Sequence, residues 1–282
     1  MNFWNLLWLW FVLASLQPVV QKQLLAAQRR RKLFVLSRRR RATVITLIHR
    51  QETMSFLGFP IARYIDIDDA ESILRAINET PPSRDIEVIL HTPGGLVLAA
   101  SQIASALADH PAKVRAVVPH YAMSGGTLIA LAADEIVLDS HATLGPVDPQ
   151  LGQYAAASIL AALEVQQRHD DSTLILGDVS RKAIFQVETF VRQLLGRRLE
   201  PARARDVAHI LSTGVWTHDH PLSASDLVAL GLPVKVGVDS EERDLLRLYP
   251  QPRGREAAVE YMPGPPALPR REPARSSGRG GD

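Results

Sequence analysis

Residues 86–133, IEVILHTPGGLVLAASQIASALADHPAKVRAVVPHYAMSGGTLIALAA, decide the fold of this chain. A strand-like apolar run at 86–90 is followed by a Gly-Gly turn and a helical run at 96–108. A second strand-like run, 114–118, is followed by a Ser-Gly-Gly turn and a helical run at 127–133. Alternation of strands and helices is typical of a parallel sheet covered by helices, so we predict a layered α/β domain.

The same alternation extends outward from this stretch. Further strands are predicted at 42–48, 135–138 and 234–236, and further helices at 68–77, 155–167, 179–195, 202–211 and 223–230. From residue 249 the sequence becomes rich in Pro, Arg, Gly and Ser and cannot bury a core, so we predict a disordered tail. Three segments follow: a leader at 1–41, one domain at 42–248 and the tail at 249–282.

Both turns in the opening stretch have residues suited to chemistry. The HTPGG turn at 91–95 would let backbone amides face an anionic group at a helix N-terminus, although an ordinary tight turn has the same sequence. In the YAMSGGT turn at 121–127, Ser124 stands where a nucleophile is exposed and the next amide is an oxyanion donor. Ser124 could instead be only a helix N-cap.

The two turns together indicate more than either alone. Gly95 precedes Ser124 by 29 positions, with one helix and one strand between them. Parallel strands end at the same edge of a sheet, so this spacing predicts that the two turns meet. One turn would then supply an oxyanion amide, and the other the nucleophile and a second amide.

The combination resembles a known group of enzymes. HTPGG followed by MSGGTLIALAADEIVLDSHATLGPVDPQ is similar to the Clp-fold serine proteases, which include the Clp proteolytic subunit and the signal peptide peptidase A group. The segments LSTGVWTHDHP at 211–221 and LGLPV at 230–234, with the apolar leader, resemble most closely the membrane-anchored serine dehydrogenase proteinases. The resemblance covers about 42–240. It implies a Clp/crotonase-like core of repeated ββα units, Ser124 as nucleophile, and the amides of Gly95 and Gly125 as the oxyanion hole.

The general base is harder to predict. The Clp proteolytic subunit has a histidine about 25 positions after its serine, where this chain has Pro149. The signal peptide peptidase A group uses a lysine, and Lys182 lies 58 positions after Ser124 in a chain with only five lysines among 32 basic residues. An arginine cannot replace such a lysine because it does not deprotonate in proteins. We therefore predict a Ser124–Lys182 dyad, against the alternative that Lys182 is a solvated residue at a helix start.

The HDH sequence at 218–220 is the other candidate. His218 and Asp219 could brace the site, form a catalytic His–Asp pair, or join a metal site. No further ligands are spaced convincingly for a metal, so we predict none. We interpret Asp148, which lies between two prolines, as a turn anchor and His91 as a residue that shapes the oxyanion loop.

The net charge of +2 hides a strong asymmetry. Residues 1–50 have ten Lys/Arg and no Asp or Glu, so the remaining residues sum to −8. An acidic body argues against nucleic-acid binding. The uncharged run at 3–20 precedes the basic residues, which predicts a single-pass anchor with the peptidase domain in the cytoplasm. Asn5, Gln17 and Pro18 leave open a helix that lies on the membrane surface.

The leading prediction is a membrane-anchored serine peptidase without a cofactor, acting on protein or peptide substrates. The alternatives are a crotonase-like acyl-CoA enzyme and a non-catalytic membrane scaffold of the same fold. The resemblance also implies a homo-oligomer, and the basic leader implies contact with membrane lipid. The chain has no cysteine, which excludes disulfides and a cysteine nucleophile.

Overall fold

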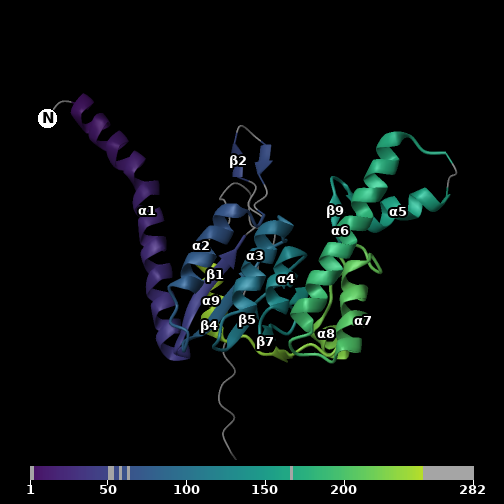
Figure 1. Ribbon diagram of the computed structural model, residues 1–282. Coiled ribbons are helices and arrows are strands. Elements are labelled where there is room, and N and C mark those ends of the chain that lie inside the picture. Colours follow the sequence, from purple (N-terminus) through teal and green to yellow (C-terminus); the bar gives the residue numbers. More distant parts are fainter. Residues whose placement is uncertain (1–2, 50–53, 57–58, 62–63, 166–167, 250–282) are drawn as a thin grey trace, which may run out of the picture. The chain divides into compact units, whose positions relative to one another are not determined.

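The computed structural model describes residues 3–49, 54–56, 59–61, 64–165 and 168–249 (Figure 1). At its centre is a five-stranded sheet of order β1-β4-β5-β7-β11 in which every adjacent pair is parallel. The strands are β1 (Ala42–Ile48), β4 (Asp85–His91), β5 (Val114–Val118), β7 (Glu135–Leu138) and β11 (Val234–Val236). The predicted α/β fold with a parallel sheet is confirmed.

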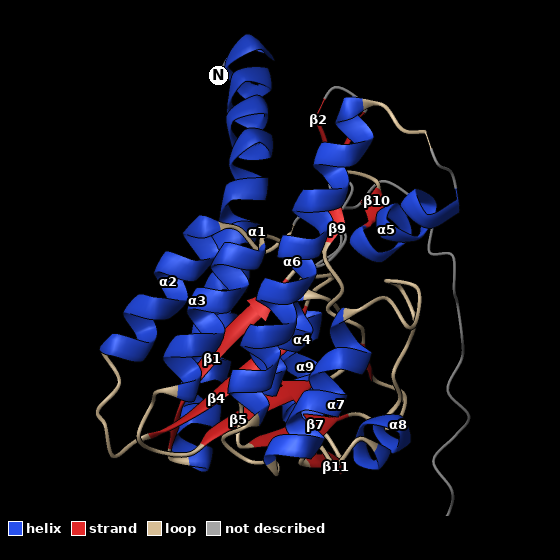
Figure 2. Ribbon diagram, turned by 45° about the vertical axis from the view of Figure 1, so that its right-hand side comes forward, coloured by secondary structure: helices blue, strands red, loops and turns tan. Residues whose placement is uncertain are grey.

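Helices cover both faces of this sheet (Figure 2). The larger layer contains α2 (Ile67–Asn78), α3 (Val97–Ala108), α4 (Gly125–Leu131), α6 (Asp171–Leu195), α7 (Pro201–Ser212) and α8 (Ala224–Ala229). The other face packs against the end of α1 (Phe3–Arg40) and against α9 (Ser240–Arg247). The remaining elements are α5 (Ala156–Val165) and the short strands β2 (Met54–Phe56), β3 (Phe59–Ile61), β6 (Tyr121–Ala122), β8 (Thr143–Leu144), β9 (Gln150–Leu151) and β10 (Tyr154–Ala155).

Strand β4 explains why the sheet needs two helical layers. Ile86, Val88 and Leu90 point into the larger apolar cluster, whereas Ile89 packs with residues of α1 and α9. Successive side chains of a strand point to opposite faces, so a strand that is apolar on both faces must be covered on both. Glu87 is the exception in β4, and it lies on the α1/α9 face.

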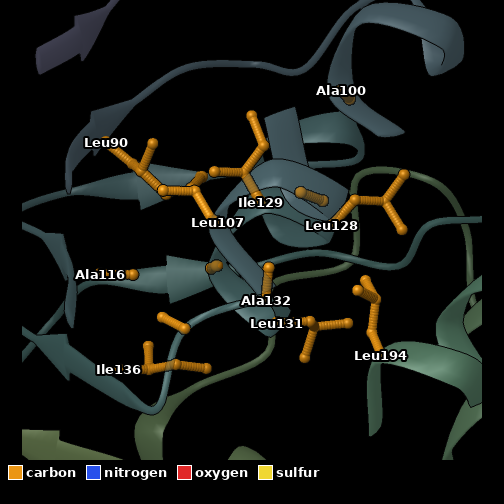
Figure 3. Packing of buried hydrophobic residues seen from close by; sticks show 14 of the residues in the cluster. Leu90, Ala100, Leu107, Ala116, Leu128, Ile129, Leu131, Ala132, Ile136 and Leu194 are labelled. Carbon is orange, nitrogen blue, oxygen red and sulfur yellow. The ribbon is translucent and has the colours of Figure 1, made fainter. Parts of the chain in front are cut away.

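Helix α4 lies in the middle of the core. All of its residues are buried, and Leu128, Ile129 and Leu131 pack among Leu90, Leu107 and Leu194 (Figure 3). A helix enclosed in this way cannot tilt without opening cavities. The turn that begins α4 is therefore held in a fixed position, which matters because Ser124 lies in that turn.

The leader forms the long helix α1, and many of its apolar side chains are exposed, including Trp4, Trp8 and Trp10. Within the described residues, no helix combines the length and the apolar character needed to cross a membrane. The prediction of a transmembrane anchor at 3–20 is therefore not supported. In physical terms, polar residues such as Gln17 interrupt the apolar run, and α1 continues without a break into its basic second half.

Two further differences concern boundaries. Helix α6 begins at Asp171, eight positions before the predicted start, because the Asp170 side chain caps it by accepting a hydrogen bond from Thr173 N at 2.8 Å. Helix α9 was not predicted. The chain divides into the units Met1–Gln251 and Pro252–Asp282. The second unit, like most of the predicted tail at 249–282, lies outside the described residues.

Candidate active site

The two predicted turns meet at the carboxyl end of the central strands. Thr92 N donates to Tyr121 O at 3.2 Å, and Met123 N donates to Thr92 O at 3.0 Å. A Cβ atom placed on Gly94 would lie 2.7 Å from Ser124 Cβ, so only glycine allows this approach. The backbone hydrogen bonds thus fix the HTPGG turn against the serine turn.

Ser124 has an unusual backbone. Its φ of 50° and ψ of −116° place it in a region that residues other than glycine rarely adopt. It stands at the N-cap of α4, yet its side chain makes no capping hydrogen bond. The interpretation of Ser124 as a mere cap is therefore wrong. Strain of this kind, of order 1–3 kcal/mol, persists where the surroundings impose it and clusters at active sites.

Gly95 and Gly125 bring two backbone amides together. A Cβ atom placed on Gly125 would lie 3.5 Å from Gly95 N. Within the described part of the chain, no backbone carbonyl accepts a hydrogen bond from either amide. The Gly94 carbonyl accepts from Ile65 N at 2.8 Å, and in a trans peptide the following N–H points the opposite way. Both amides are thus available to a ligand beside Ser124.

A histidine–carboxylate pair lies beside the serine turn. His218 Nδ1 is 2.8 Å from Asp148 Oδ1, and Gln150 Nε2 donates to Asp148 Oδ2 at 2.7 Å. The Asp148 side chain is only 2 % exposed, whereas His218 is partly exposed. Gly145 lies between His218 and the residue before Ser124: a Cβ there would clash with the Met123 side chain and lie 3.7 Å from His218 O. The partner of His218 is thus Asp148, interpreted from sequence as a turn anchor.

Lys182 lies in a different environment from the one its sequence position indicated. It is in the interior of α6 rather than at a helix start. Its Nζ atom is 2.5 Å from Asp178 Oδ2 on the preceding turn, and its side chain is 68 % exposed. A lysine that is exposed and bound to a carboxylate lacks the buried setting in which lysines act as general bases. The dyad with Ser124 stays a prediction that this geometry does not favour.

The other predicted residues have lesser roles in the site. The His91 ring lies 4.5 Å from that of Tyr121 and 5.5 Å from that of His120, behind the HTPGG turn. Asp219 is exposed and does not cap α8, whose N-cap is Ser223. The His220 ring stacks on Trp216 at 5.3 Å. The three residues of the HDH sequence therefore point to three different environments.

An open apolar cavity of about 470 Å³ adjoins these turns. Val97 and Leu98 begin the helix after Gly95, Leu128 lies one turn beyond Ser124, and Pro149 follows Asp148. The remaining lining comes from Ser101, Gln150, Leu151, Ala183, Gln186, Val187 and Phe190. A peptide held at Ser124 would have space there for an apolar side chain.

A nucleophile turn, two unengaged amides and a histidine–carboxylate pair are the parts of a serine hydrolase. In agreement, the family model described as ClpP-like SDH-type serine proteinase matches residues 1–275. The chain belongs to this family. The resemblance seen in the sequence is confirmed, and the family favours a peptidase over an acyl-CoA enzyme or a scaffold.

Two relatives come from Methanocaldococcus jannaschii. Uncharacterized protein MJ0137 is 50 % identical over 260 residues, covering 92 % of this chain and 91 % of the relative. Uncharacterized protein MJ1495 is 53 % identical over 223 residues, covering 79 % and 76 %. Among solved structures, the 1510-N membrane-bound stomatin-specific protease, in a serine-to-alanine mutant form, is 19 % identical with a TM-score of 0.47, covering 73 % of this chain and 82 % of that one.

Proposed function

We propose that this protein is a serine peptidase that forms an acyl-enzyme on Ser124. Ser124 Oγ would attack the scissile carbonyl, and the amides of Gly95 and Gly125 would stabilise the oxyanion. The leaving amine would take up the proton that Ser124 gave to the base, and water would then hydrolyse the ester and restore the serine. The observation that carries this proposal is the close packing of Gly94 on the strained Ser124, with the Gly95 amide beside Gly125.

For the base, we favour His218 over Lys182. With Nδ1 of His218 donating to the Asp148 carboxylate, Nε2 keeps a lone pair that would accept the serine proton. The buried carboxylate would also stabilise the imidazolium that forms. Lys182 lacks such a setting because it is exposed and paired with Asp178.

Labelling with a fluorophosphonate probe tests both parts of the proposal. We expect the wild type to be labelled and Ser124→Ala not to be. His218→Gln should slow labelling at least about 10³-fold, because serine without its base is a poor nucleophile. Lys182→Ala should stay within about threefold, since the side chain is exposed and its ion-pair partner Asp178 is not a site residue.

His209→Gln is the matched control for the histidine change. His209 also has a carboxylate partner, Glu188 at 3.2 Å, but it lies on the exposed side of α7. We expect His209→Gln to be labelled like the wild type. If folded Lys182→Ala loses labelling while His218→Gln keeps it, the lysine is the base and our assignment is wrong. If the wild type is not labelled, the peptidase proposal itself fails.

The surroundings support two extensions of the proposal. The apolar cavity favours cleavage beside an apolar residue, which mapping of cut sites in a peptide mixture would test. The exposed apolar side chains Leu174, Ile175 and Phe185 of α6 support self-association, for which light scattering gives the mass. The cytoplasmic location of the domain and contact of the leader with lipid stay predictions from the charge pattern alone.

A further inference from the structure

A chain of three side chains, from His49, Asp69 and Thr92, supports the HTPGG turn, and no role was predicted from the sequence for any of the three. His49 follows β1, and its Nε2 atom is 3.0 Å from Asp69 Oδ2 in the first turn of α2. Its Nδ1 atom is 3.0 Å from Thr92 Oγ1 in the HTPGG turn. His49 is 6 % exposed and Thr92 is fully buried, so water has little access to the contact between them, whereas the Asp69 carboxylate is 28 % exposed.

Each atom of this chain has one consistent role. Gly94 N donates to Thr92 Oγ1 at 3.2 Å, so the hydroxyl oxygen acts as an acceptor for the loop. The hydroxyl proton is then free to point to His49 Nδ1, while His49 Nε2 donates to the Asp69 carboxylate. The other acceptor for that hydroxyl, Gly94 O, is farther away at 3.5 Å. The chain therefore runs from Gly94 through Thr92 and His49 to a carboxylate.

Asp69 also anchors the segment on the other side of the loop. Its carboxylate accepts from Asp66 N at 3.1 Å, within the capping box that begins α2. Ile65, the residue before Asp66, donates to Gly94 O at 2.8 Å and accepts from Leu96 N at 2.9 Å. Two groups hold Gly94: the Thr92 hydroxyl and the Ile65 amide. The Asp69 carboxylate supports the first through His49 and the second through the Asp66 amide.

The electrostatics of Asp69 agree with this role. Burial alone would raise its pKa, but the hydrogen bond from His49 and that from the Asp66 amide hold the pKa below its usual value. Asp69 is therefore an ionised acceptor at neutral pH.

We propose that Asp69, His49 and Thr92 are positioning residues that hold the Gly94–Gly95 peptide with its N–H toward the reacting carbonyl. This rests on the proposed peptidase function and deepens it. An oxyanion donor acts only if it is already placed where the charge will develop, so a loop that can rotate loses most of its benefit. The arrangement Thr92–His49–Asp69 is not a second catalytic triad, because the Thr92 hydroxyl is fully buried.

The test separates positioning from folding by measuring two constants of fluorophosphonate labelling, the maximal labelling rate and the half-saturating concentration of the probe. Thr92→Val removes the hydroxyl with little change in volume, and Thr92→Ser keeps it. We expect Thr92→Val to lower the maximal labelling rate about 10-fold to 100-fold with the probe's half-saturating concentration unchanged, because the donor matters in the transition state. Thr92→Ser should restore the rate. Thr80→Val is the matched control, since Thr80 is also buried and its hydroxyl bonds Ala76 O at the other end of α2.

A second pair of variants covers the case in which Thr92→Val does not fold. Asp69→Asn keeps an acceptor for the cap but loses the charged partner of His49, whereas Asp66→Asn changes the same cap and leaves His49 alone. We expect the maximal rate to fall about fivefold or more in Asp69→Asn only. A wild type that is labelled, with unchanged maximal rates in folded Thr92→Val or Asp69→Asn, overturns the positioning role. An unlabelled wild type overturns the peptidase proposal instead.

Discussion

The two ends of the central sheet are held together by different kinds of residues. At the carboxyl end, glycines and a strained serine bring backbone atoms close together. At the amino end, Glu87 and Glu242 are almost completely buried and are shared by two arginines. Arg40 lies 2.6 Å from Glu242 and 3.5 Å from Glu87, and Arg115 lies 2.6 Å from Glu87.

This difference separates function from stability within one sheet. Ligands of parallel α/β sheets bind outside the carboxyl ends of the strands, where loops can be shaped freely. The amino end instead joins α1, the sheet and α9 through charges. Burial raises the pKa of Glu87, and the nearby charge of Glu242 raises it further. Arg115 and Arg40 lower this pKa, but the net shift is upward. We therefore expect changes at one end to affect labelling, and changes at the other to affect unfolding.

Among the changes that test this contrast between the two ends, the largest effect is expected from Gly95→Ala. The new Cβ would overlap the backbone of Ile65 and push the oxyanion amide out of place. Loss of one such donor typically raises the barrier by about 2.7–4 kcal/mol, so labelling of Ser124 should slow at least 10²-fold. Comparison of labelling rates with thermal unfolding, recorded for the same samples, provides the measurement.

Gly237→Ala is the control for this change. Gly237 also has a positive φ, 133°, but a Cβ there would meet open space. It should lose about 1–3 kcal/mol of stability through backbone strain and keep full labelling. Equal loss of labelling in both variants would mean that strain anywhere in the sheet, rather than the position of the amide, impairs the site.

The second effect is on stability and comes from Arg40→Met. Removing one partner from a buried ion pair typically costs about 3–5 kcal/mol, and here the two buried carboxylates would be left to share Arg115 alone. Arg39 offers a matched control, as it pairs with Glu241 at 2.7 Å but is 55 % exposed. Arg39→Met should cost less than about 1 kcal/mol. Urea unfolding gives both values, and fluorophosphonate labelling should be unchanged in each variant.

The outcome for Arg40→Met can be checked by a compensating change. Adding Glu242→Gln removes one of the two buried negative charges and should recover part of the lost stability. If Arg40→Met and Arg39→Met unfold alike, the network does not stabilise the amino end. The contrast between the two ends would then disappear.

The sequence allowed the Ser-Gly-Gly turn and the strands of the central sheet to be predicted because their signals are local. A Ser-Gly-Gly after a β-branched run and before an apolar run identifies a strand-to-helix junction from adjacent residues. The start of α6 lies before the apolar pattern that predicts a helix at 179–195, and its signal is the N-cap residue Asp170.

The pairing of His218 could not be predicted in this way. His218 and Asp148 are 70 positions apart, and Asp219, the adjacent residue, was the more obvious partner. His49, Asp69 and Thr92 likewise come from three elements whose proximity depends on strand order. A histidine directly after a predicted strand was the available signal for His49, but its partners required the sheet topology.

The smallest effect is expected at Glu135, also at the amino end. Hydrogen bonds from Lys113 and Lys235, at 2.5 and 2.8 Å, lower the pKa of Glu135 to about 2. A folded pKa below the unfolded value means that the unfolded state binds more protons, so this stabilisation is present at neutral pH and is lost as pH falls from about 4.5 toward 2. Glu135→Gln should remove this contribution to the loss of stability at acid pH. Both lysines are largely exposed, so solvent screening should keep the difference below about 1 kcal/mol.

The control for this change is Glu71→Gln, which removes an exposed carboxylate of α2. Between pH 2 and 7, the urea midpoints of the wild type and of Glu71→Gln should change with pH in the same way. The midpoint of Glu135→Gln should lie below that of the wild type at neutral pH and should meet it near pH 2. Because exposed charges are screened by salt, the gap at neutral pH should shrink at high ionic strength, whereas that of Arg40→Met should persist. If salt does not change the stability difference between the wild type and Glu135→Gln, the contacts of Glu135 with Lys113 and Lys235 behave like the buried network. The two lysines would then be held more tightly than their exposure indicates.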